Sequence, residues 1–176
     1  MHESIANGTI FRVGILSDTH SHLDRGVFHH FSNCNEIWHA GDIGDVAVLE
    51  ELNQFKPTVA VFGNIDDTAI RKNIPENQLL ERNGAKIFIT HIAGQPPRYN
   101  ARVTDLIRSE KPSILVCGHS HILKVIPDKV HNLLFINPGA AGIQGFHRTK
   151  TLIRMEINNG RPTQLEVIEL GPRGKI

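Results

Sequence analysis

The sequence predicts an α/β protein, a four-layer αββα sandwich in which two mixed β-sheets pack face to face and helices cover them. Three observations support this fold class. Strand-like and helix-like segments alternate through the first sixty residues, an Asn-Gly turn signal follows Pro75, and β-rich runs fill residues 122–170. With 176 residues the chain is long enough for one sizeable core and short for two, so we expect a single domain over residues 1–176.

The first part of the chain has the pattern of a βαβαβ unit. Apolar, β-rich runs at residues 10–16, 36–39 and 58–62 predict three strands. Apolar residues at helical spacing predict a helix in each gap, the first presenting Leu23, Val27 and Phe31 and the second Val46, Leu49 and Leu52. The short connections imply that these three strands form a parallel sheet.

The second part predicts a further sheet, antiparallel or mixed. Residues 78–81 and 86–90 flank Asn83-Gly84, a dipeptide suited to a tight hairpin turn. Asn100 can cap a helix whose apolar face is Val103, Leu106 and Ile107. Further strands are expected at residues 114–117, 122–126, 133–136, 151–157 and 165–170.

The composition is that of an ordinary globular protein, with 40% hydrophobic and 21% charged residues. A formal net charge of +1 gives no general attraction to nucleic acid, so we expect no nucleic-acid partner. No apolar run approaches the roughly 20 residues that span a bilayer, and residues 1–9 lack a secretory signal pattern. We therefore expect a cytoplasmic protein without a membrane partner, with Cys34 and Cys117 as small core residues.

Six short polar clusters each follow an apolar run of strand length: Ser17-Asp18-Thr19-His20, His39-Ala40-Gly41-Asp42, Gly63-Asn64-Ile65-Asp66, Thr90-His91, Gly118-His119-Ser120-His121 and Asn137-Pro138-Gly139. Because strand ends of open α/β sheets converge on one crevice, we expect these clusters to meet. They offer seven nitrogen and oxygen ligands of the kind that suit a pair of divalent metals: Asp18, His20, Asp42, Asn64, His91, His119 and His121.

Two of these motifs place ligand candidates two residues apart. In extended backbone, the side chains of Asp18 and His20 would share a side and could bind one ion, although Asp18 could instead cap the next helix. His119 and His121 repeat this spacing, and Gly118 would let the backbone turn without steric hindrance. Two exposed loop histidines are the alternative interpretation of this second pair.

The other candidates are single side chains. The two oxygens of Asp42 could bridge two metals, and the amide oxygen of Asn64 could complete a coordination sphere without adding charge. Both positions are also common turn positions for Asp and Asn. A lone histidine such as His91 is more often a hydrogen-bonded structural residue than a ligand.

Taken in order, the motifs resemble the calcineurin-like metallophosphoesterases, and within them the small bacterial and archaeal phosphodiesterase branch. The family pattern is Asp-x-His, Gly-Asp-x-x-Asp, Gly-Asn-x-Asp or Glu, a lone His, and Gly-His-x-His. The matching residues here are Asp18/His20, Gly41-Asp42 to Asp45, Gly63-Asn64 to Asp66, His91, and Gly118-His119/His121. Asn137-Pro138-Gly139 also resembles a turn of this branch, with Ala140 where a serine is usual.

The resemblance implies one metal ion held by Asp18, His20, Asp42 and His121, and a second held by Asp42, Asn64, His91 and His119. Asp42 would then bridge the ions, and the residues expected to be catalytic are Asp42, Asn64 and His119. Asp45 and Asp66 are either supporting residues or ordinary turn residues. His22, His39 and Arg148 could lie near the crevice, but the sequence gives them no task.

The expected activity is that of a metal-dependent phosphodiesterase acting on a small phosphate ester. Two ions about 3.5–4 Å apart can lower the pKa of water toward about 7, so that a bridging hydroxide attacks phosphorus in line. We expect manganese, with iron, nickel or zinc as alternatives, because all suit mixed imidazole and carboxylate ligands.

Two departures from the family pattern bear on the reaction. Ile65 stands where many members have a histidine that assists the leaving oxygen, and such general acid help is typically worth about 10²–10⁴-fold. Ile92-Ala93 follows His91 where this branch often has Gly-His, which affects substrate-side contacts.

Other function classes stay open at this point. Ile65 favours a non-catalytic scaffold that binds partner proteins, as in the retromer subunit that resembles this branch, although every ligand position here keeps a coordinating side chain. A nuclease would be expected to have a basic groove and an added domain. The near-neutral charge and the short chain disfavour this class. The late strands could also offer an edge for a homodimer.

Overall fold

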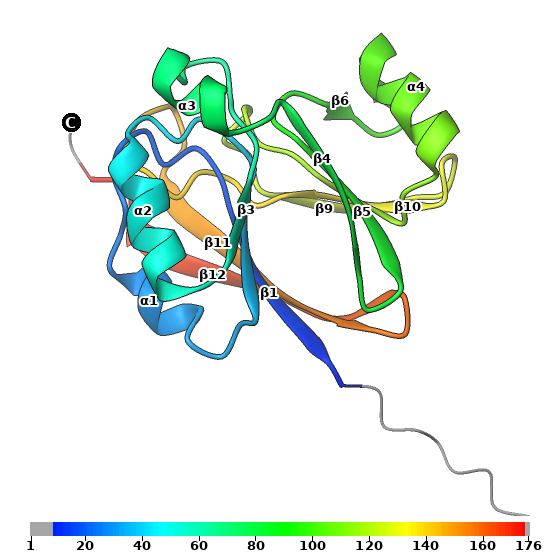
Figure 1. Ribbon diagram of the computed structural model, residues 1–176, viewed down its shortest axis with the longest axis horizontal. Coiled ribbons are helices and arrows are strands. Elements are labelled where there is room, and N and C mark those ends of the chain that lie inside the picture. Colours follow the sequence, from blue (N-terminus) through cyan, green and yellow to red (C-terminus); the bar gives the residue numbers. More distant parts are fainter. Residues whose placement is uncertain (1–8, 175–176) are drawn as a thin grey trace, which may run out of the picture.

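The computed structural model describes residues 9–174 and contains two five-stranded sheets that pack against each other (Figure 1). The first sheet has the order β12-β11-β1-β2-β3. Its strands are β1 (Phe11–Leu16), β2 (Glu36–His39), β3 (Thr58–Ala60), β11 (Thr149–Asn158) and β12 (Arg161–Pro172). The second has the order β4-β5-β8-β10-β9. Its strands are β4 (Asn77–Arg82), β5 (Ala85–Thr90), β8 (Ile114–Val116), β9 (Lys124–Asp128) and β10 (Leu133–Asn137).

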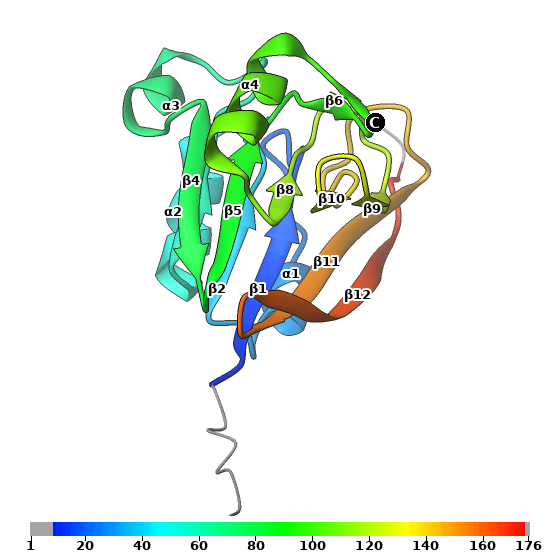
Figure 2. The same cartoon turned by 90° about the vertical axis from the view of Figure 1, so that its right-hand side faces the viewer.

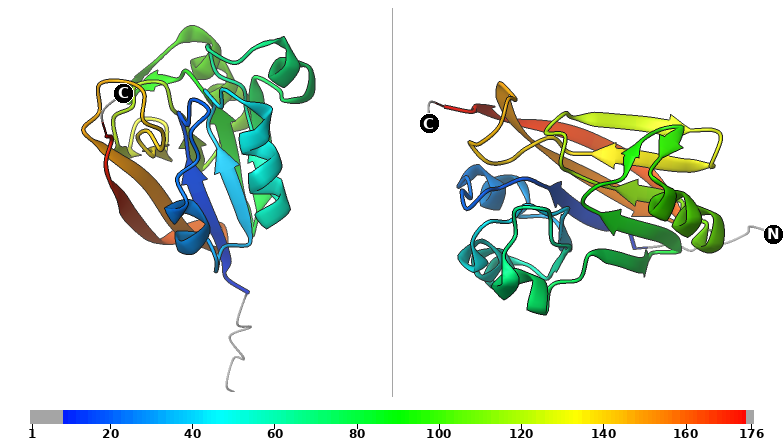
Figure 3. Two further views of the ribbon diagram at one scale, coloured as in Figure 1. Left: turned by 90° about the vertical axis from the view of Figure 1, so that its left-hand side faces the viewer. Right: turned by 90° about the horizontal axis from the view of Figure 1, so that it is seen from above.

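Four helices and a small extra hairpin complete the fold. The helices are α1 (Gly26–His30), α2 (Val46–Phe55), α3 (Thr68–Asn73) and α4 (Ala101–Glu110), and the hairpin pairs β6 (Gly94–Gln95) with β7 (Arg98–Tyr99). Helices α1 and α2 lie on the outer face of the first sheet, and α4 lies on the opposite side of the molecule (Figures 1 and 3). No helix in residues 9–174 has the length and apolar content needed to cross a membrane.

Three apolar clusters hold these layers together. The central one joins the facing sides of the two sheets, with Val13 and Ile15 from β1 packed among Ile87 and Ile89 from β5. A second cluster packs α1, α2 and α3 on the first sheet, and a third packs α4 on the second sheet. Successive residues of a strand therefore face different clusters, as the period of two in a strand requires. The predicted four-layer αββα fold class is confirmed.

Six strands form two parallel sets, one in each sheet, and these sets bring the polar clusters together. β1, β2 and β3 are parallel within the first sheet, and β5, β8 and β10 are parallel within the second. β1, β5 and β8 run toward the same edge of the molecule in Figure 2. All six polar clusters follow the carboxyl ends of these six strands, and we call this edge the loop edge.

The structure corrects several sequence expectations about the elements. The last two strands join the first sheet, because β11 pairs antiparallel with β1 from Phe11↔Ile157 onward. The strand expected at 122–126 begins at Lys124, and the apolar Ile122 before it is exposed. In α2, Val48 is buried in place of the expected Val46. α3, β6 and β7 were not predicted, since segments of six or two residues are too short to show a period.

Glu36 connects the two sheets through buried polar contacts. Its Oε1 accepts a 2.6 Å hydrogen bond from the indole Nε1 of the buried Trp38. Its Oε2 lies 2.9 Å from the guanidinium of Arg82, which stands on β4 of the other sheet. A buried donor without a partner destabilises the fold by the free energy needed to remove it from water. The Glu36 carboxylate, as the acceptor for Trp38, is therefore important for stability.

We predict that Glu36→Ala lowers the free energy of unfolding by about 1–3 kcal/mol, because the indole N–H of Trp38 loses its partner. Glu36→Gln keeps an amide oxygen for that bond and should cost less. Chemical denaturation of both variants measures the difference. Glu51→Ala is the control, since its ion pair with Arg25 is exposed and such pairs contribute about 0–1 kcal/mol. Equal losses in the two Glu36 variants would contradict this explanation.

Candidate metal centre

The seven predicted ligand candidates meet at the loop edge, and both sheets contribute to them. Asp18 and His20 follow β1, Asp42 follows β2, and Asn64 comes shortly after β3. The remaining three follow strands of the second sheet: His91, His119 and His121. The packing of one sheet on the other therefore sets the distances across the site.

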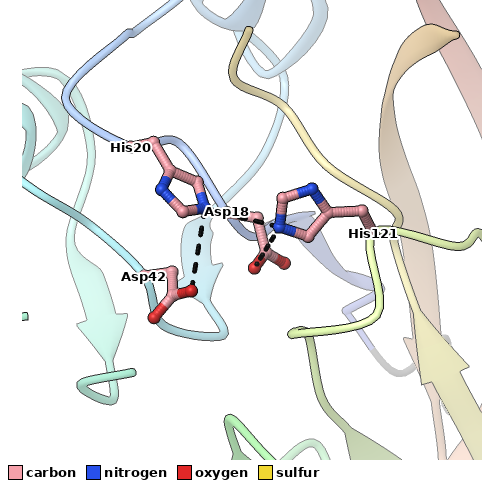
Figure 4. Close-up of side chains that lie close together, drawn as sticks. All are labelled: Asp18, His20, Asp42 and His121. Carbon is pink, nitrogen blue, oxygen red and sulfur yellow. Dashed lines mark hydrogen bonds and ion pairs between the residues drawn. The ribbon is translucent and has the colours of Figure 1, made fainter. Parts of the chain in front are cut away.

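The first group of side chains that could hold a metal is Asp18, His20, Asp42 and His121 (Figure 4). Each offers a donor atom within 4.8 Å of the others. His121 Nε2 lies 3.2 Å from an Asp18 carboxylate oxygen and 3.3 Å from His20 Nε2. His20 Nε2 lies 3.7 Å from Asp42 Oδ2.

The second group is Asp42, His91 and His119. The amide oxygen of Asn64 completes it, at 3.1 Å from His91 Nε2 and 2.9 Å from His119 Nδ1. All members of both groups except the exposed His119 and Asn64 are buried or half-buried. The structure thus brings together all seven candidates, in the two sets that the sequence resemblance implied.

Asp42 belongs to both groups because its two oxygens face different neighbours. Oδ2 is the atom nearest His20, while Oδ1 lies 3.1 Å from His91 Nε2. The backbone N–H of Ile65 also donates to Oδ1, at 3.1 Å, and holds the carboxylate in place. Burial would raise the pKa of Asp42, but its hydrogen bond to His91 and the charge of that ring bring the pKa below its ordinary value.

The hydrogen bonds of His91 show that this donor set suits a cation. Its Nδ1 lies 2.7 Å from the carbonyl oxygen of Ala40, which can only accept, so Nδ1 carries a proton. Nε2 then faces two oxygens, from Asp42 and Asn64, and a proton or a metal ion must lie among these three atoms. Burial lowers the pKa of His91, but the Asp42 hydrogen bond and the nearby carboxylates outweigh burial and raise it.

Five of the candidates have a backbone conformation that residues other than glycine rarely adopt. Positive φ occurs at Asp18, His20, Asp42, His119 and His121. The backbone at the paired residues is therefore left-handed and not extended as predicted. Each of these side chains projects from a left-handed turn. Backbone hydrogen bonds hold the turns after β1 and β2 together, including Asp18 N to Gly41 O at 2.9 Å and His20 N to Asp42 O at 3.0 Å. Residues held in such regions are typical of functional sites.

Two glycines let these loops approach closely. A Cβ on Gly118 would lie 2.0 Å from Ser17 Oγ, and one on Gly63 would lie 2.1 Å from Asp42 Oδ1. Gly118 was expected to allow a turn, but its φ is not positive, and its role is to leave room for the loop after β1.

Comparisons with known proteins identify the family of the chain. Residues 11–160 match the model of the calcineurin-like phosphoesterase superfamily domain. The chain belongs to this superfamily. It is 30% identical over 171 residues to a probable metallophosphoesterase of Methanocaldococcus jannaschii, a match that covers 94% of this chain and 85% of that protein. A phosphodiesterase of the same organism is 28% identical over 144 residues, which cover 73% of this chain and 82% of that protein.

Solved structures share the fold at lower identity. A novel archaeal phosphodiesterase aligns with a TM-score of 0.72 and 24% identity, covering 91% of this chain and all of that one. Wild-type Vps29 of Entamoeba histolytica, solved with zinc, aligns with a TM-score of 0.69 and 17% identity, covering 93% of this chain and all of that one. These likenesses support the fold described above.

Asp66 and Asn137 support the loops of the candidate metal centre, whereas Asp45 caps a helix. Asp66 is buried, and its two oxygens accept from the N–H groups of Gly44, at 2.8 Å, and Gly63, at 2.7 Å. Asn137 Nδ2 donates to Gly118 O at 2.7 Å and so holds the turn that carries His119. Asp45 is the N-cap of α2, where its side chain accepts from Ala47 N. Arg148 is exposed, and neither it nor His22 belongs to a donor group.

His147 is a residue of the site that sequence reasoning missed. Its Nδ1 lies 3.3 Å from His121 Nδ1, and its Nε2 lies 3.0 Å from the carbonyl oxygen of Gly142. Because that carbonyl only accepts, Nε2 of His147 carries the proton and Nδ1 accepts from His121. A Cβ on Gly145 would lie only 2.1 Å from the same His121 nitrogen. No local motif marks His147, since its partner is 26 residues away in the chain.

His39 is a buried structural residue beside the centre. Gly41 N donates to its Nδ1 at 3.2 Å, so Nε2 carries the proton and pairs with Thr19 Oγ1 at 2.9 Å. Thr19 Oγ1 in turn donates to Ile43 O at 3.0 Å. Burial lowers the pKa of His39 to about 4, against the partial opposition of nearby carboxylates. The neutral ring therefore ties the turn after β1 to the turn after β2.

We predict that His39 makes the metal-free protein less stable in mild acid. The unfolded chain binds a proton near pH 6.5 and the folded chain only near pH 4, so stability falls as the pH drops through this window. Between pH 7 and pH 5 the loss should be about 2 kcal/mol. Denaturant titrations at the two pH values should show a smaller loss in His39→Gln and an unchanged one in His29→Gln, an exposed control. An identical loss in His39→Gln would show that other groups cause it.

Proposed function

We propose that this protein is a phosphodiesterase that uses two divalent metal ions, held by the seven candidate residues. The observation that carries this proposal is the position of Asp42, whose Oδ2 faces His20 and whose Oδ1 faces His91. A carboxylate shared by two donor groups is suited to bridge two ions. Membership of the phosphoesterase superfamily and the M. jannaschii phosphodiesterase relative support the reaction class.

In this proposal Asp18, His20 and His121 hold one ion with Asp42, and Asn64, His91 and His119 hold the other with it. The ions, when bound, lower the pKa of water so that hydroxide is available and withdraw negative charge from the phosphoryl group. The chain's own contribution is to fix the donors. His91 is oriented by Ala40 O, and Asp42 by the N–H of Ile65.

The donor set also bears on which ions would bind. It combines imidazole nitrogens with carboxylate and amide oxygens, and manganese, iron, nickel and zinc all accept such a mixture. Manganese is our first choice for loading experiments. Zinc deserves a parallel measurement because the Vps29 structure that shares this fold was solved with it.

We predict that Asp42→Asn abolishes most of the activity. The manganese-loaded protein should hydrolyse bis(p-nitrophenyl) phosphate, and a chelator should stop it. Loss of the shared carboxylate should lower kcat/KM by more than about 100-fold, because even changes to residues behind metal ligands cost about 10–100-fold. Metal content measured by mass spectrometry should fall below two ions per chain.

Asp45→Asn is the matched control for this experiment. It makes the same change of charge three residues away, and Asn caps helices as well as Asp does, so activity and metal content should stay unchanged. Full turnover in Asp42→Asn would contradict the proposal. So would two tightly bound ions without turnover of any phosphate ester, which would favour a binding role.

We predict a second effect from His147, which accepts from His121 and fixes its ring. His147→Ala should weaken metal affinity by about 10–100-fold, the range found for residues behind metal ligands. His147→Gln should restore much of it, since an amide can accept from His121 and donate to Gly142 O. Chelator competition measures affinity, and the melting temperature of the metal-free protein should change little. A His147→Ala protein with wild-type affinity would show that the contact has no positioning role.

A further inference from the structure

Two cavities flank the second donor group of the centre. The first, the arginine pocket, measures about 350 Å³ and is lined by Phe62, Asn64, Arg71, His91, Ile92 and Arg102. The second, the lysine pocket, measures about 280 Å³ and is lined by Ile92, His119, Ser120, Ile122, Lys124 and Phe135. Volumes near 300 Å³ are at the small end of the range for sites that bind organic molecules.

The two pockets meet at the proposed metal ligands. Asn64 lines the arginine pocket and His119 lines the lysine pocket, and their side chains are 2.9 Å apart. Ile92, which directly follows His91, is a wall of both pockets. A phosphorus atom bound at the centre would therefore have an open cavity on either side of Ile92.

Several exposed apolar residues are next in sequence to residues of this polar centre, and two of them, Ile92 and Ile122, line the pockets. Four of the large apolar residues exposed in residues 9–174 are sequence neighbours of a residue of the centre: Ile65, Ile92, Ile122 and Phe146. Their exposed fractions are 45%, 40%, 55% and 104%. Exposed apolar residues scattered singly need no explanation, but a group around one site is typical of a surface that binds apolar ligand groups.

The charged groups of the arginine pocket already have partners. The guanidinium of Arg71 donates to the carbonyl oxygens of Gly63, Asn64 and Asp66 at 2.6–3.1 Å and lies 4.6 Å from the centroid of the Phe62 ring. Arg102 bonds Asn77 and Thr90 and lies 3.5 Å from a carboxylate oxygen of Glu76. Because the protein already engages these guanidinium donors, this pocket suits an organic group that needs few new hydrogen bonds, although the charge of Arg71, whose partners are neutral carbonyls, is not cancelled.

The lysine pocket has a different character. The described partner of Lys124 Nζ is the neutral amide oxygen of Gln95, so its positive charge is not cancelled there by a carboxylate. Ile122 and Phe135 supply the apolar part of the wall. This pocket can take an organic group that is polar or negatively charged at its far end.

We propose that these pockets bind the two organic substituents of a phosphodiester, one on each side of Ile92, and that Ile92 determines the preference for bulky substituents. This inference rests on the proposed function and deepens it. A phosphomonoester, or a diester with one methyl group, leaves at least one pocket empty. Such a substrate gains less binding free energy, because less apolar surface is removed from water.

Two chromogenic substrates with the same leaving group test this proposal. In the manganese-loaded protein, Ile92→Ala should lower the ratio of kcat/KM for bis(p-nitrophenyl) phosphate to that for methyl p-nitrophenyl phosphate by about tenfold. Comparing this ratio between variants removes the difference in intrinsic reactivity between the two esters. Ile122→Ala, which opens only the lysine pocket, should lower the ratio less. Val130→Ala removes an apolar group that is more exposed, at 73%, and that lines neither pocket, so it should leave the ratio unchanged.

A binding measurement separates failure of this inference from failure of the proposed function. Diphenylphosphinate and dimethylphosphinate cannot be hydrolysed, and calorimetry on the metal-loaded protein should show the diphenyl compound binding about tenfold more tightly. Ile92→Ala should remove most of this preference with metal content and melting temperature unchanged. Equal affinities in the wild-type protein, or an unchanged preference in a folded, metal-loaded Ile92→Ala protein, would overturn the inference. If the protein hydrolyses no ester but still prefers the diphenyl compound, the proposed reaction would be overturned and the inference about the pockets would stand.

Discussion

The structure depends on one constraint: two separate sheets must end at the same edge so that the carboxylate of Asp42 can face donors from both. Its Oδ2 faces His20, which follows β1 of the first sheet, and its Oδ1 faces His91, which follows β5 of the second. Packing in the apolar layer between the sheets therefore determines how the donors of one sheet lie relative to those of the other. A cavity in that layer would shift one set of donors relative to the other, since close-packed interiors transmit strain.

The donors are held by a backbone that would be unfavourable elsewhere. Non-glycine residues in sparsely populated conformations cost roughly 1–3 kcal/mol each and persist only where the surroundings determine them. Here the surroundings do so through main-chain bonds such as His20 N to Asp42 O, and through side chains such as Asp66, which bonds two loops at once. The loops of the centre are thus tied to one another by hydrogen bonds, and close positioning of donors requires such support.

Sequence patterns predicted the parts of this fold whose signal is local. Apolar, β-rich runs located β1 and β5, and the order of the polar clusters identified the seven ligand candidates that the structure brings together. The sequence could not show that β11 pairs with β1, because a contact across more than a hundred residues leaves no periodic trace. His147 was missed over a shorter span, because no local motif marks a contact between residues 26 positions apart. The strand expected at 122–126 is present as β9 but begins at Lys124, and the side chain of Ile122 is exposed, so hydrophobicity there was not a sign of burial.

Ile65 shows how the polar centre and its apolar surroundings work together. The motif resemblance implies a proton-donating histidine at this position, whereas here the backbone N–H of Ile65 supports Asp42 and the isoleucine side chain is exposed. Under the proposed function, a leaving oxygen receives no proton from position 65, so the rate must depend on the acidity of the leaving group itself. In the proposed binding mode the two pockets would compensate, because binding free energy from the organic substituents can orient an ester whose leaving group is not assisted. Under these two proposals, isoleucine at position 65 would change which esters the centre can use, while every candidate metal ligand keeps a coordinating side chain.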